Sequence, residues 1–277
     1  MQDTIDTIIY HGDCPDGFCA AFVAKRRYPT ANLVPATYGK PLDESQIRNK
    51  HVLVVDFSWK RADMERIASQ TTSIYVLDHH KTAEAELAEL PYAYFDMNRS
   101  GAQLAWDHCF PANQPRPWYV DYVADRDLWR WHLPESKTVS AYLMALPHTI
   151  DAWAALDSIS VETAIANGRG ARAQVEHYVD KVTVQAYSGR WNGHTVAIVN
   201  AAYPNISDVG HRLCEQGAQV GLGWFVRGDG MIQFSLRSVG DLDVSQLAQE
   251  HGGGGHKNAA GFQVPMTEGL AILRDLT

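Results

Sequence analysis

Short runs of β-branched residues alternate with amphipathic stretches over the first third of the chain, and this alternation most limits how it can fold. The runs that predict strands are TIDTIIY, ANLVPA, HVLVVDF and SIYVLD, and helical patterns span residues 18–27 and 60–69. Strand and helix in alternation predict a parallel sheet with helices on its faces. Ligands of such sheets bind at the carboxyl ends of the strands. The polar residues that follow each strand are therefore the candidates for a site.

The remainder of the chain predicts helices followed by a second, smaller α/β domain. Residues 117–131 predict a helix that ends near a site, and residues 137–158 predict further packing helices. Helical spacing over residues 161–187 predicts a long connecting helix, after which GHTVAIVNA, QVGLGWFV and MIQFSLRS predict strands. The expected division of the 277 residues is a first domain (1–158), a helical linker (159–188) and a second domain (189–277).

Composition argues against several classes of protein. The net charge of −8 argues against a protein that coats long duplex nucleic acid, because such binding neutralises many phosphates, whereas a short anionic substrate is compatible. The four cysteines form neither paired C-x-x-C zinc spacing nor a secreted disulfide framework. The chain begins without the basic stretch of a signal peptide, and no run approaches the roughly 20 apolar residues that span a bilayer. We expect a cytoplasmic protein with no membrane partner.

Three predicted strands each deliver a carboxylate to the same edge of the sheet. The first strand leads into HGDCPDG, which contains His11, Asp13 and Asp16, and two later strands end at Asp56 and Asp78. A single Asp in such a turn is usually only a helix N-cap. Several carboxylates at one edge repel and raise one another's pKa values, and a divalent cation relieves this. Oxygen-rich ligands with one or two imidazoles suit Mn²⁺ or Mg²⁺.

The run Asp78-His79-His80 is the most specific signal in the sequence. Two adjacent histidines behind a strand-end Asp are difficult to explain as core residues. One imidazole can bind a metal while Asp78 orients it, and the other can face a substrate phosphate.

Two further segments are candidates for binding an anion. The run HGGGGHKNAAG, residues 251–261, lets backbone amides approach a ligand closely, with His256 and Lys257 as additional donors. A flexible loop is the alternative. Arg99 and Ser100 precede a helical pattern, so either Ser100 is only a cap beside a solvated Arg99, or Arg99 and the helix N-terminus hold an anion.

The order of these motifs resembles that of the DHH phosphoesterases, a family named for the tripeptide at residues 78–80. The resemblance covers nearly the whole chain: HGDCPDG, VVDF, the tripeptide, Ala124-Asp125 and the glycine-rich motif, which is similar to that of the DHH-associated domain. It implies that residues 1–158 form the metal-binding catalytic domain and residues 189–277 the substrate-binding domain. The metal ligands it implies are His11, Asp13, Asp16, Asp56, His79 and Asp125. Asp78 would support the site and His80 would contact substrate. The substrate-binding residues it implies are Arg237, Ser238, Gly254, Gly255, His256 and Lys257, and Arg99 joins them as a candidate from its place before a helix N-terminus.

Two positions depart from the family pattern or leave alternatives open. Cys14 stands near where a carboxylate is expected, so either Asp13 substitutes, Cys14 ligates as a thiolate, or the first metal is weakly held. Asp125 and Asp127 are spaced so that only one readily occupies the ligand position, and the resemblance favours Asp125. Asp127 is then expected to pair with a neighbouring arginine, Arg126 or Arg130, or to cap a turn.

The resemblance implies a Mn²⁺-dependent phosphoesterase with one or two ions, Mg²⁺ or Co²⁺ being alternatives. A metal-activated water would hydrolyse phosphodiester or phosphomonoester bonds of short oligonucleotides or nucleotides. The same scaffold serves exopolyphosphatases and pyrophosphatases, and a non-catalytic nucleotide-binding regulator is a further alternative. Tyr122, Trp129 and Trp131 are candidates for base stacking, although their helical spacing is more often that of core residues. Partners are therefore a short oligonucleotide, nucleotide or polyphosphate, with a homodimer possible.

Overall fold

The computed structural model describes residues 4–12 and 14–276 of the chain. The chain forms two compact units, residues 1–172 and 173–277, which divide within the long helix α8 (Val161–Thr183). None of the described helices is both long and apolar enough to cross a bilayer.

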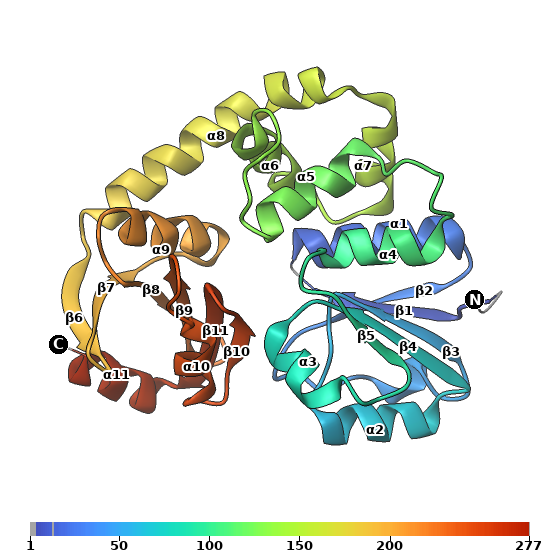
Figure 1. Cartoon of the computed structure of the whole chain (residues 1–277), viewed down its shortest axis with the longest axis horizontal. Helices are drawn as coiled ribbons and strands as arrows, with labels where there is room; N and C mark the ends of the chain where they lie inside the picture. The colour runs from blue at the N-terminus through green and yellow to red at the C-terminus, as the bar shows by residue number, and fades with distance from the viewer. Residues whose placement is uncertain (1–3, 13, 277) are drawn as a thin grey trace. The chain divides into compact units, whose positions relative to one another are not determined.

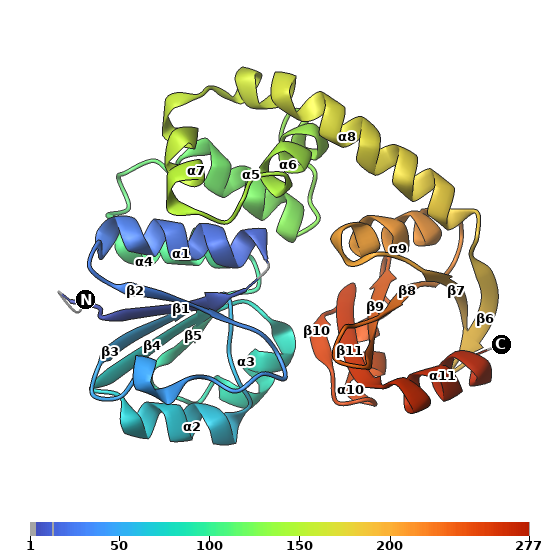
Figure 2. The same cartoon turned by 180° about the vertical axis from the view of Figure 1, so that it is seen from behind.

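The first unit is built around a five-stranded parallel sheet in the order β2-β1-β3-β4-β5, which confirms the predicted fold class (Figure 1). Its strands are β1 (Thr7–His11), β2 (Asn32–Ala36), β3 (His51–Val55), β4 (Ser73–Asp78) and β5 (Ala93–Phe95). Helices α1 (Pro15–Arg27) and α4 (Gly101–Cys109) cover one face, and α2 (Arg61–Gln70) and α3 (Lys81–Leu87) cover the other (Figure 2).

The strand order reverses between β1 and β3. Helix α1 leads from β1 to β2 on one face of the sheet, whereas α2 leads from β3 to β4 on the opposite face. The carboxyl ends of β1 and β3 therefore diverge into loops that run to opposite faces. In open α/β sheets this reversal creates the crevice in which ligands bind.

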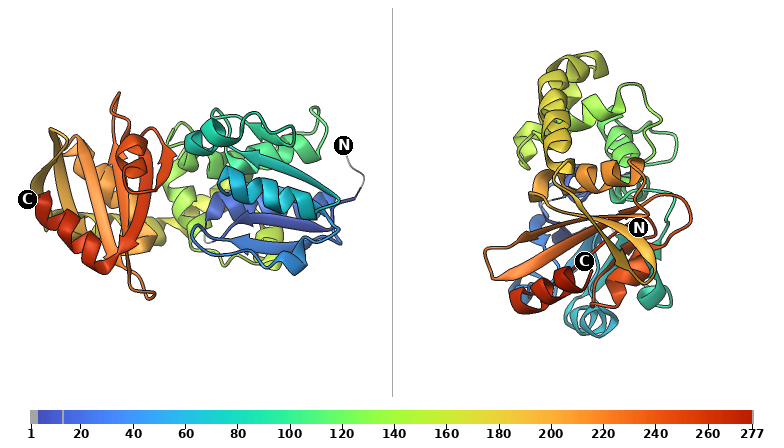
Figure 3. Two further views of the ribbon diagram at one scale, coloured as in Figure 1. Left: turned by 90° about the horizontal axis from the view of Figure 1, so that it is seen from below. Right: turned by 90° about the vertical axis from the view of Figure 1, so that its left-hand side faces the viewer.

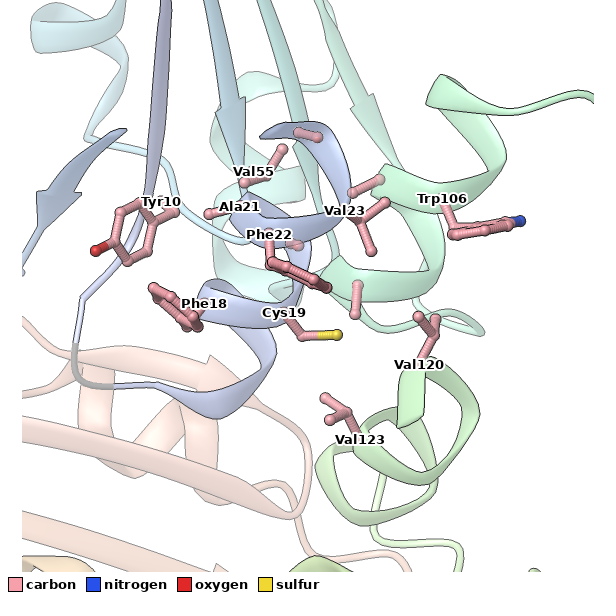
Figure 4. Packing of buried hydrophobic residues seen from close by; sticks show 14 of the residues in the cluster. Tyr10, Phe18, Cys19, Ala21, Phe22, Val23, Val55, Trp106, Val120 and Val123 are labelled. Atoms are coloured by element: carbon pink, nitrogen blue, oxygen red, sulfur yellow. The ribbon is translucent and has the colours of Figure 1, made fainter. Parts of the chain in front are cut away.

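Helix α1 lies in the core of the first unit, beside α4 on the same face of the sheet. Phe18, Phe22 and Val23 are buried among side chains of the sheet, α4 and α5, as Figure 4 shows. The ring of Phe18 packs edge-on against Tyr10 of β1, with centroids 5.8 Å apart. Pro15 begins the helix, where its missing N–H has no consequence, and a basic last turn complements the helix dipole.

Further helices complete the first unit around the buried Trp153. They are α5 (Trp118–Asp127), α6 (Ser136–Met144), α7 (Ile150–Ala154) and a 3₁₀ segment (Ala155–Ser158). The helix expected over residues 117–131 ends at Asp127, because Trp129 and Trp131 both take a positive φ, 54° and 55°. Positive φ is incompatible with a continuing right-handed helix.

The second unit contains a separate, mixed six-stranded sheet in the order β10-β11-β9-β8-β7-β6 (Figure 3). Only β7 and β8 are parallel among its described pairs. The strands are β6 (Tyr187–Trp191), β7 (His194–Asn200), β8 (Val220–Val226), β9 (Met231–Ser238), β10 (Gly254–His256) and β11 (Ala259–Pro265). Helix α9 (Ile206–Glu215) covers one face, and α10 (Val244–Gln249) and α11 (Met266–Asp275) pack on the other (Figure 1). The expectation of a second α/β domain is thus confirmed.

Candidate metal centre

The carboxyl ends of β1, β3 and β4 bring the predicted residues to one edge of the sheet. His11 is the last residue of β1, Asp56 directly follows β3, and Asp78 ends β4. The strands are in register there, since Val55 pairs with both Tyr10 and Leu77. The edge is therefore level, and its polar side chains share one small volume.

Asp56 lies at the centre of this group. Its Oδ1 is 3.1 Å from Nε2 of His79, its Oδ2 is 3.5 Å from Nδ1 of His11, and its side chain is 2% exposed. The backbone of Asp56 is left-handed, with φ at 56°, and this conformation turns the chain away from the direction of β3, which ends at Val55. Burial raises the pKa of Asp56, but the imidazoles of His11 and His79 hold it below the usual range. Asp56 is therefore a buried carboxylate between two imidazoles.

Three carboxylates converge on the imidazole of His79. Besides Asp56, Oδ2 of Asp127 lies 3.4 Å and Oδ2 of Asp16 lies 3.6 Å from Nε2. Burial opposes a charge on His79, but the three carboxylates outweigh it and raise the pKa to about 10. Burial and mutual repulsion raise the pKa values of Asp16 and Asp127. The cluster of carboxylates thus favours a positive charge at this point. Protonated His79 provides one such charge.

The N-terminus of α4 holds Asp16 in place. The carboxylate of Asp16 accepts hydrogen bonds from the amides of Gly101 (2.6 Å) and Ala102 (3.0 Å). A Cβ atom at residue 101 would lie 2.4 Å from Cβ of Asp56 and 2.9 Å from Oδ2 of Asp16. Only glycine at this position lets the helix end approach both carboxylates.

Two sets of potential ligand atoms contain the residues expected to bind metal and Asp127, and the atoms of each set lie within 4.8 Å of one another. One set is Asp16, His79 and Asp127, and the other is His11, Cys14 and Asp56. Three buried atoms of these sets, Nδ1 of His11, Oδ2 of Asp56 and Oδ2 of Asp127, have no hydrogen-bond partner within residues 4–12 and 14–276. A buried polar atom without a partner costs about 1–3 kcal/mol. The residues therefore fit one or two divalent ions.

Asp78 supports the group from behind. Its Oδ1 accepts hydrogen bonds from Nδ1 of His80 (2.7 Å) and the amide of His79 (2.8 Å), and its Oδ2 accepts one from Ser58 (2.7 Å). Burial raises the pKa of Asp78, but the imidazoles of His80 and His79 together bring it below the ordinary value. For His80, burial lowers the pKa and Asp78 raises it above the ordinary value. Asp78 thus fixes both the main chain of the histidine pair and the ring of His80.

Comparison with known proteins supports the resemblance seen in the sequence. Residues 183–276 match the DHHA1 domain, the domain associated with this family. The chain belongs to the DHH phosphoesterase family. Members of this family are metal-dependent phosphohydrolases.

Relatives of this DHH protein cover nearly its whole length. It is 30% identical over 294 residues to the uncharacterized protein R106 of Acanthamoeba polyphaga mimivirus, an alignment that covers 94% of this chain and 68% of the relative. An exopolyphosphatase-related protein from Bacteroides fragilis is 13% identical, with a TM-score of 0.54 and coverage of 99% and 91%. PggH, a pGpG-specific phosphodiesterase from Vibrio cholerae, is 12% identical, with a TM-score of 0.51 and coverage of 98% and 97%. These two structures share the fold of the chain.

The structure of this DHH protein brings together four of the six predicted ligands, His11, Asp16, Asp56 and His79. Asp13 lies outside the described residues. Asp125 is not in the group, because its carboxylate accepts hydrogen bonds from the amides of His132 (2.9 Å) and Leu133 (3.1 Å).

Asp127 takes the place expected for Asp125. The two arginines expected as its partners have other contacts: Arg126 lies over the rings of Trp129 and Trp131, and Arg130 donates to the carbonyl of Asn98. The sequence contained a signal for Asp127, since Val120, Val123, Ala124 and Asp127 form one i, i+3, i+4, i+7 stripe of the helix. The buried face of α5 therefore points Asp127 towards the sheet edge.

Arg99, a predicted anion-binding residue, is held within the protein. It donates to Asp96 (2.8 Å), Asp107 (2.8 Å) and the hydroxyl of Tyr94 (2.6 Å). Ser100 caps α4 by accepting a hydrogen bond from the amide of Gln103. The helix N-terminus does hold an anion, but that anion is Asp16 of the same chain.

The aromatic candidates for base stacking differ in burial. Tyr122 is buried, and Trp129 and Trp131 are half-buried around Arg126.

The predicted substrate residues of the DHHA1 domain lie at the end of β9, in β10 and in the turn from β10 to β11, a region that we call the β9–β11 corner. Arg237 donates to Ser207 and to the carbonyl of Leu236, and Ser238 donates to the carbonyl of Leu242. Lys257 forms an exposed ion pair with Asp241 at 3.1 Å. Gly254, Gly255 and His256 form β10, which pairs with β11, so this part of the glycine run is a strand and not a flexible loop. At Gly255, φ is 139° and a Cβ atom would lie 2.5 Å from the carbonyl oxygen of Ala259.

Proposed function

We propose that this DHH protein hydrolyses phosphodiester or phosphomonoester bonds of short oligonucleotides or nucleotides, using one or two divalent ions. The proposed protein ligands are His11, Asp16, Asp56, His79 and Asp127, with Asp13 a further candidate. The observation that carries the proposal is the position of Asp56, whose two oxygens face two separate sets of ligand atoms. A carboxylate shared in this way suits a two-metal hydrolase.

The donor atoms of the set Asp16, His79 and Asp127 favour Mn²⁺, because carboxylates with one imidazole suit hard to borderline ions. Divalent metal bound by these residues would supply charge neutralisation at the phosphoryl group and a more acidic bound water. The protein keeps Asp16 and Asp56 rigid through the end of α4 and through Gly101. This rigidity presents the carboxylates in one fixed arrangement, which lowers the reorganisation needed during reaction.

His80 is the proposed contact for the phosphoryl group. The hydrogen bond from its Nδ1 to Asp78 fixes the ring and assigns a proton to Nδ1. Because Asp78 also raises the pKa of His80, the ring can carry a second proton and donate through Nε2. We assign His80 to stabilising charge on the phosphoryl oxygens or on the leaving group.

The DHHA1 domain is proposed to bind the far end of the substrate. The ion pair between Lys257 and Asp241 is exposed, and such pairs are weak. Lys257 can therefore exchange Asp241 for a substrate phosphate, with His256 and Arg237 as neighbouring donors. The similarity to PggH, whose name gives the dinucleotide pGpG as its substrate, favours a short oligonucleotide.

Two other functions are separable by experiment. The similarity to an exopolyphosphatase-related protein favours phosphoanhydride hydrolysis as the second candidate. A nucleotide-binding regulator would bind the same ligands without turnover.

The test is a side-by-side assay with Mn²⁺ on a 5′-phosphorylated dinucleotide, adenosine 3′,5′-bisphosphate, a cyclic dinucleotide and polyphosphate. We expect the dinucleotide to be hydrolysed fastest, and EDTA to abolish turnover. Turnover that survives full chelation would contradict metal dependence, and fastest release from polyphosphate would identify the phosphoanhydride alternative. Absence of turnover with all four compounds, in the presence of nucleotide binding, would identify a regulator.

The matched variant is Asp56→Asn, because Asn tolerates the left-handed backbone of this position and keeps the side-chain volume. Loss of the shared carboxylate is expected to lower kcat by more than the roughly 10–100-fold typical of losing an outer hydrogen-bond partner of a metal ligand. Steady-state kinetics at saturating Mn²⁺ measures this. A variant with more than a tenth of the normal kcat would argue against the shared role of Asp56.

A further inference from the structure

The two sets of ligand atoms differ in their chemistry. The set at Asp16, His79 and Asp127 offers oxygen and nitrogen, whereas the set at His11, Cys14 and Asp56 includes a thiol. Cys14 is the N-cap residue of α1, immediately before Pro15, and its side chain is half-buried. It forms no disulfide within the described residues. The thiol therefore stands at the edge of the metal centre in a position from which it can bind an ion.

The neighbours of Cys14 independently indicate a cation. Oδ2 of Asp56 is buried, has no hydrogen-bond partner among the described residues and lies 3.5 Å from Nδ1 of His11, which also has none. The other oxygen of Asp56 is already engaged with His79 at 3.1 Å. The free lone pair of Oδ2 thus faces the same small volume as the imidazole nitrogen and the thiol. An ion there would satisfy all three atoms at once.

A thiolate changes which ion such a position prefers. Thiolate and imidazole ligands select borderline and softer ions such as Zn²⁺, Fe²⁺ or Co²⁺, whereas carboxylates with one imidazole suit Mn²⁺ or Mg²⁺. On coordination the S–H bond is replaced by a metal–sulfur bond and the proton is released to solvent. The carboxylate of Asp56 then balances part of the charge of the ion.

We propose that His11, Cys14 and Asp56 form a thiolate-containing metal position that prefers a borderline ion over Mn²⁺, beside a harder position at Asp16, His79 and Asp127. The inference rests on the proposed metal-dependent function, since it assigns the ion at one of the two positions. It makes the centre a mixed one, in which the two positions discriminate between ions.

The test titrates metal-stripped full-length protein with Co²⁺ and records its absorption spectrum. Coordination of Co²⁺ by a thiolate produces an ultraviolet sulfur-to-cobalt charge-transfer band that oxygen and nitrogen ligands do not give. We expect this band at one equivalent of Co²⁺ in the wild type. We expect Cys14→Ser to lose the band and to bind Co²⁺ at least about tenfold more weakly, while its affinity for Mn²⁺ changes less.

Cys214→Ala is the matched control, because Cys214 is a buried free cysteine of the second unit and its thiol donates to the carbonyl of Arg237. This variant should keep the band. Thermal unfolding of metal-free Cys14→Ser shows whether it is folded, and Cys14→Ala provides a second variant. Absence of the band in the wild type, or its retention in the folded Cys14 variants, would overturn the inference.

These outcomes are independent of the proposed function. Hydrolysis with Mn²⁺ in a protein without a charge-transfer band leaves the function intact and removes the thiolate position. A band that depends on Cys14 in a protein without hydrolase activity supports the metal position and removes the proposed reaction.

Discussion

The edge of the five-stranded sheet and the β9–β11 corner of the second sheet both gather polar residues around glycines, but they use them differently. At the sheet edge, Asp56 and Asp127 keep buried oxygens without a hydrogen-bond partner among the described residues. At the corner, Ser238 both donates to Leu242 and accepts from Asn258. The carboxylate and imidazole atoms that gather at the edge without partners in the described part of the chain fit a cation, whereas the hydroxyl of Ser238 is satisfied within the protein. The difference predicts that substitutions at the edge affect chemistry and that those at the corner affect only substrate affinity.

The largest effect is expected from Gly101→Ala at the sheet edge. The added methyl group would lie 2.4 Å from Cβ of Asp56 and 2.9 Å from Oδ2 of Asp16, so it must displace two ligands. We expect the affinity for Mn²⁺, measured by isothermal titration calorimetry, to fall at least about 100-fold. This is more than the loss typical when a metal ligand loses one hydrogen-bond partner. The control is Gly170→Ala in α8, where a methyl group meets nothing within 4 Å and should add up to about 1 kcal/mol of stability. Equal metal affinities in the two variants would refute the crowding argument.

An intermediate effect is expected from two substitutions on α5, one of which should lower metal affinity and the other the free energy of unfolding. Asp127→Asn removes a proposed ligand, so Mn²⁺ affinity should fall at least about tenfold with little change in metal-free stability. Asp125→Asn disturbs the hydrogen bonds to the amides of His132 and Leu133, so the free energy of unfolding should fall by about 1–3 kcal/mol. Calorimetric titration and thermal unfolding of both variants measure the two quantities. If Asp125→Asn were the variant that loses metal affinity, Asp125 would be the ligand that the family resemblance implied.

The smallest effect is expected from Lys257→Ala at the corner. Its ion pair with Asp241 is exposed, so stability should hardly change. Loss of one phosphate contact should raise KM for the dinucleotide about two- to tenfold with kcat unchanged. Asp241→Ala is the opposite control, because it frees Lys257 and should leave KM unchanged or lower it. A KM that is unchanged in Lys257→Ala would remove this residue from the substrate site.

The sequence was sufficient for the fold because each signal was local. The alternation of strand and helix patterns predicted the parallel sheet. The observed strands β2, β3 and β4 fall within their predicted runs, and β1 extends one residue beyond its run, to His11. Periodicity carries no information on the order of strands in the sheet, however. The reversal between β1 and β3, which creates the site, became visible only in three dimensions.

The candidate site was less accessible to sequence analysis, and the two aspartates of α5 show why. Residues two apart on a helix differ in direction by about 200°, so one of the pair faces the sheet edge and the other faces away. The family motif pointed to Asp125, but the buried stripe of the helix places Asp127 beside His79. Arg99 posed a similar problem, because its partners Tyr94 and Asp96 precede it and Asp107 lies in α4 after it, and spacing alone could not identify them as partners.

The bond between Asp16 and the start of α4 links the occupancy of the centre to the folding of the whole first unit. Asp16 belongs to α1 and its carboxylate accepts hydrogen bonds from two amides of α4. It therefore joins the two helices that cover one face of the sheet. Any ion that binds only the folded arrangement adds to stability by mass action, by about 1.4 kcal/mol for each tenfold excess of free ion over its dissociation constant. Scarcity of the ion would then do more than stop catalysis. It would shift the population towards unfolded chains and shorten the lifetime of the protein in a cell that degrades them.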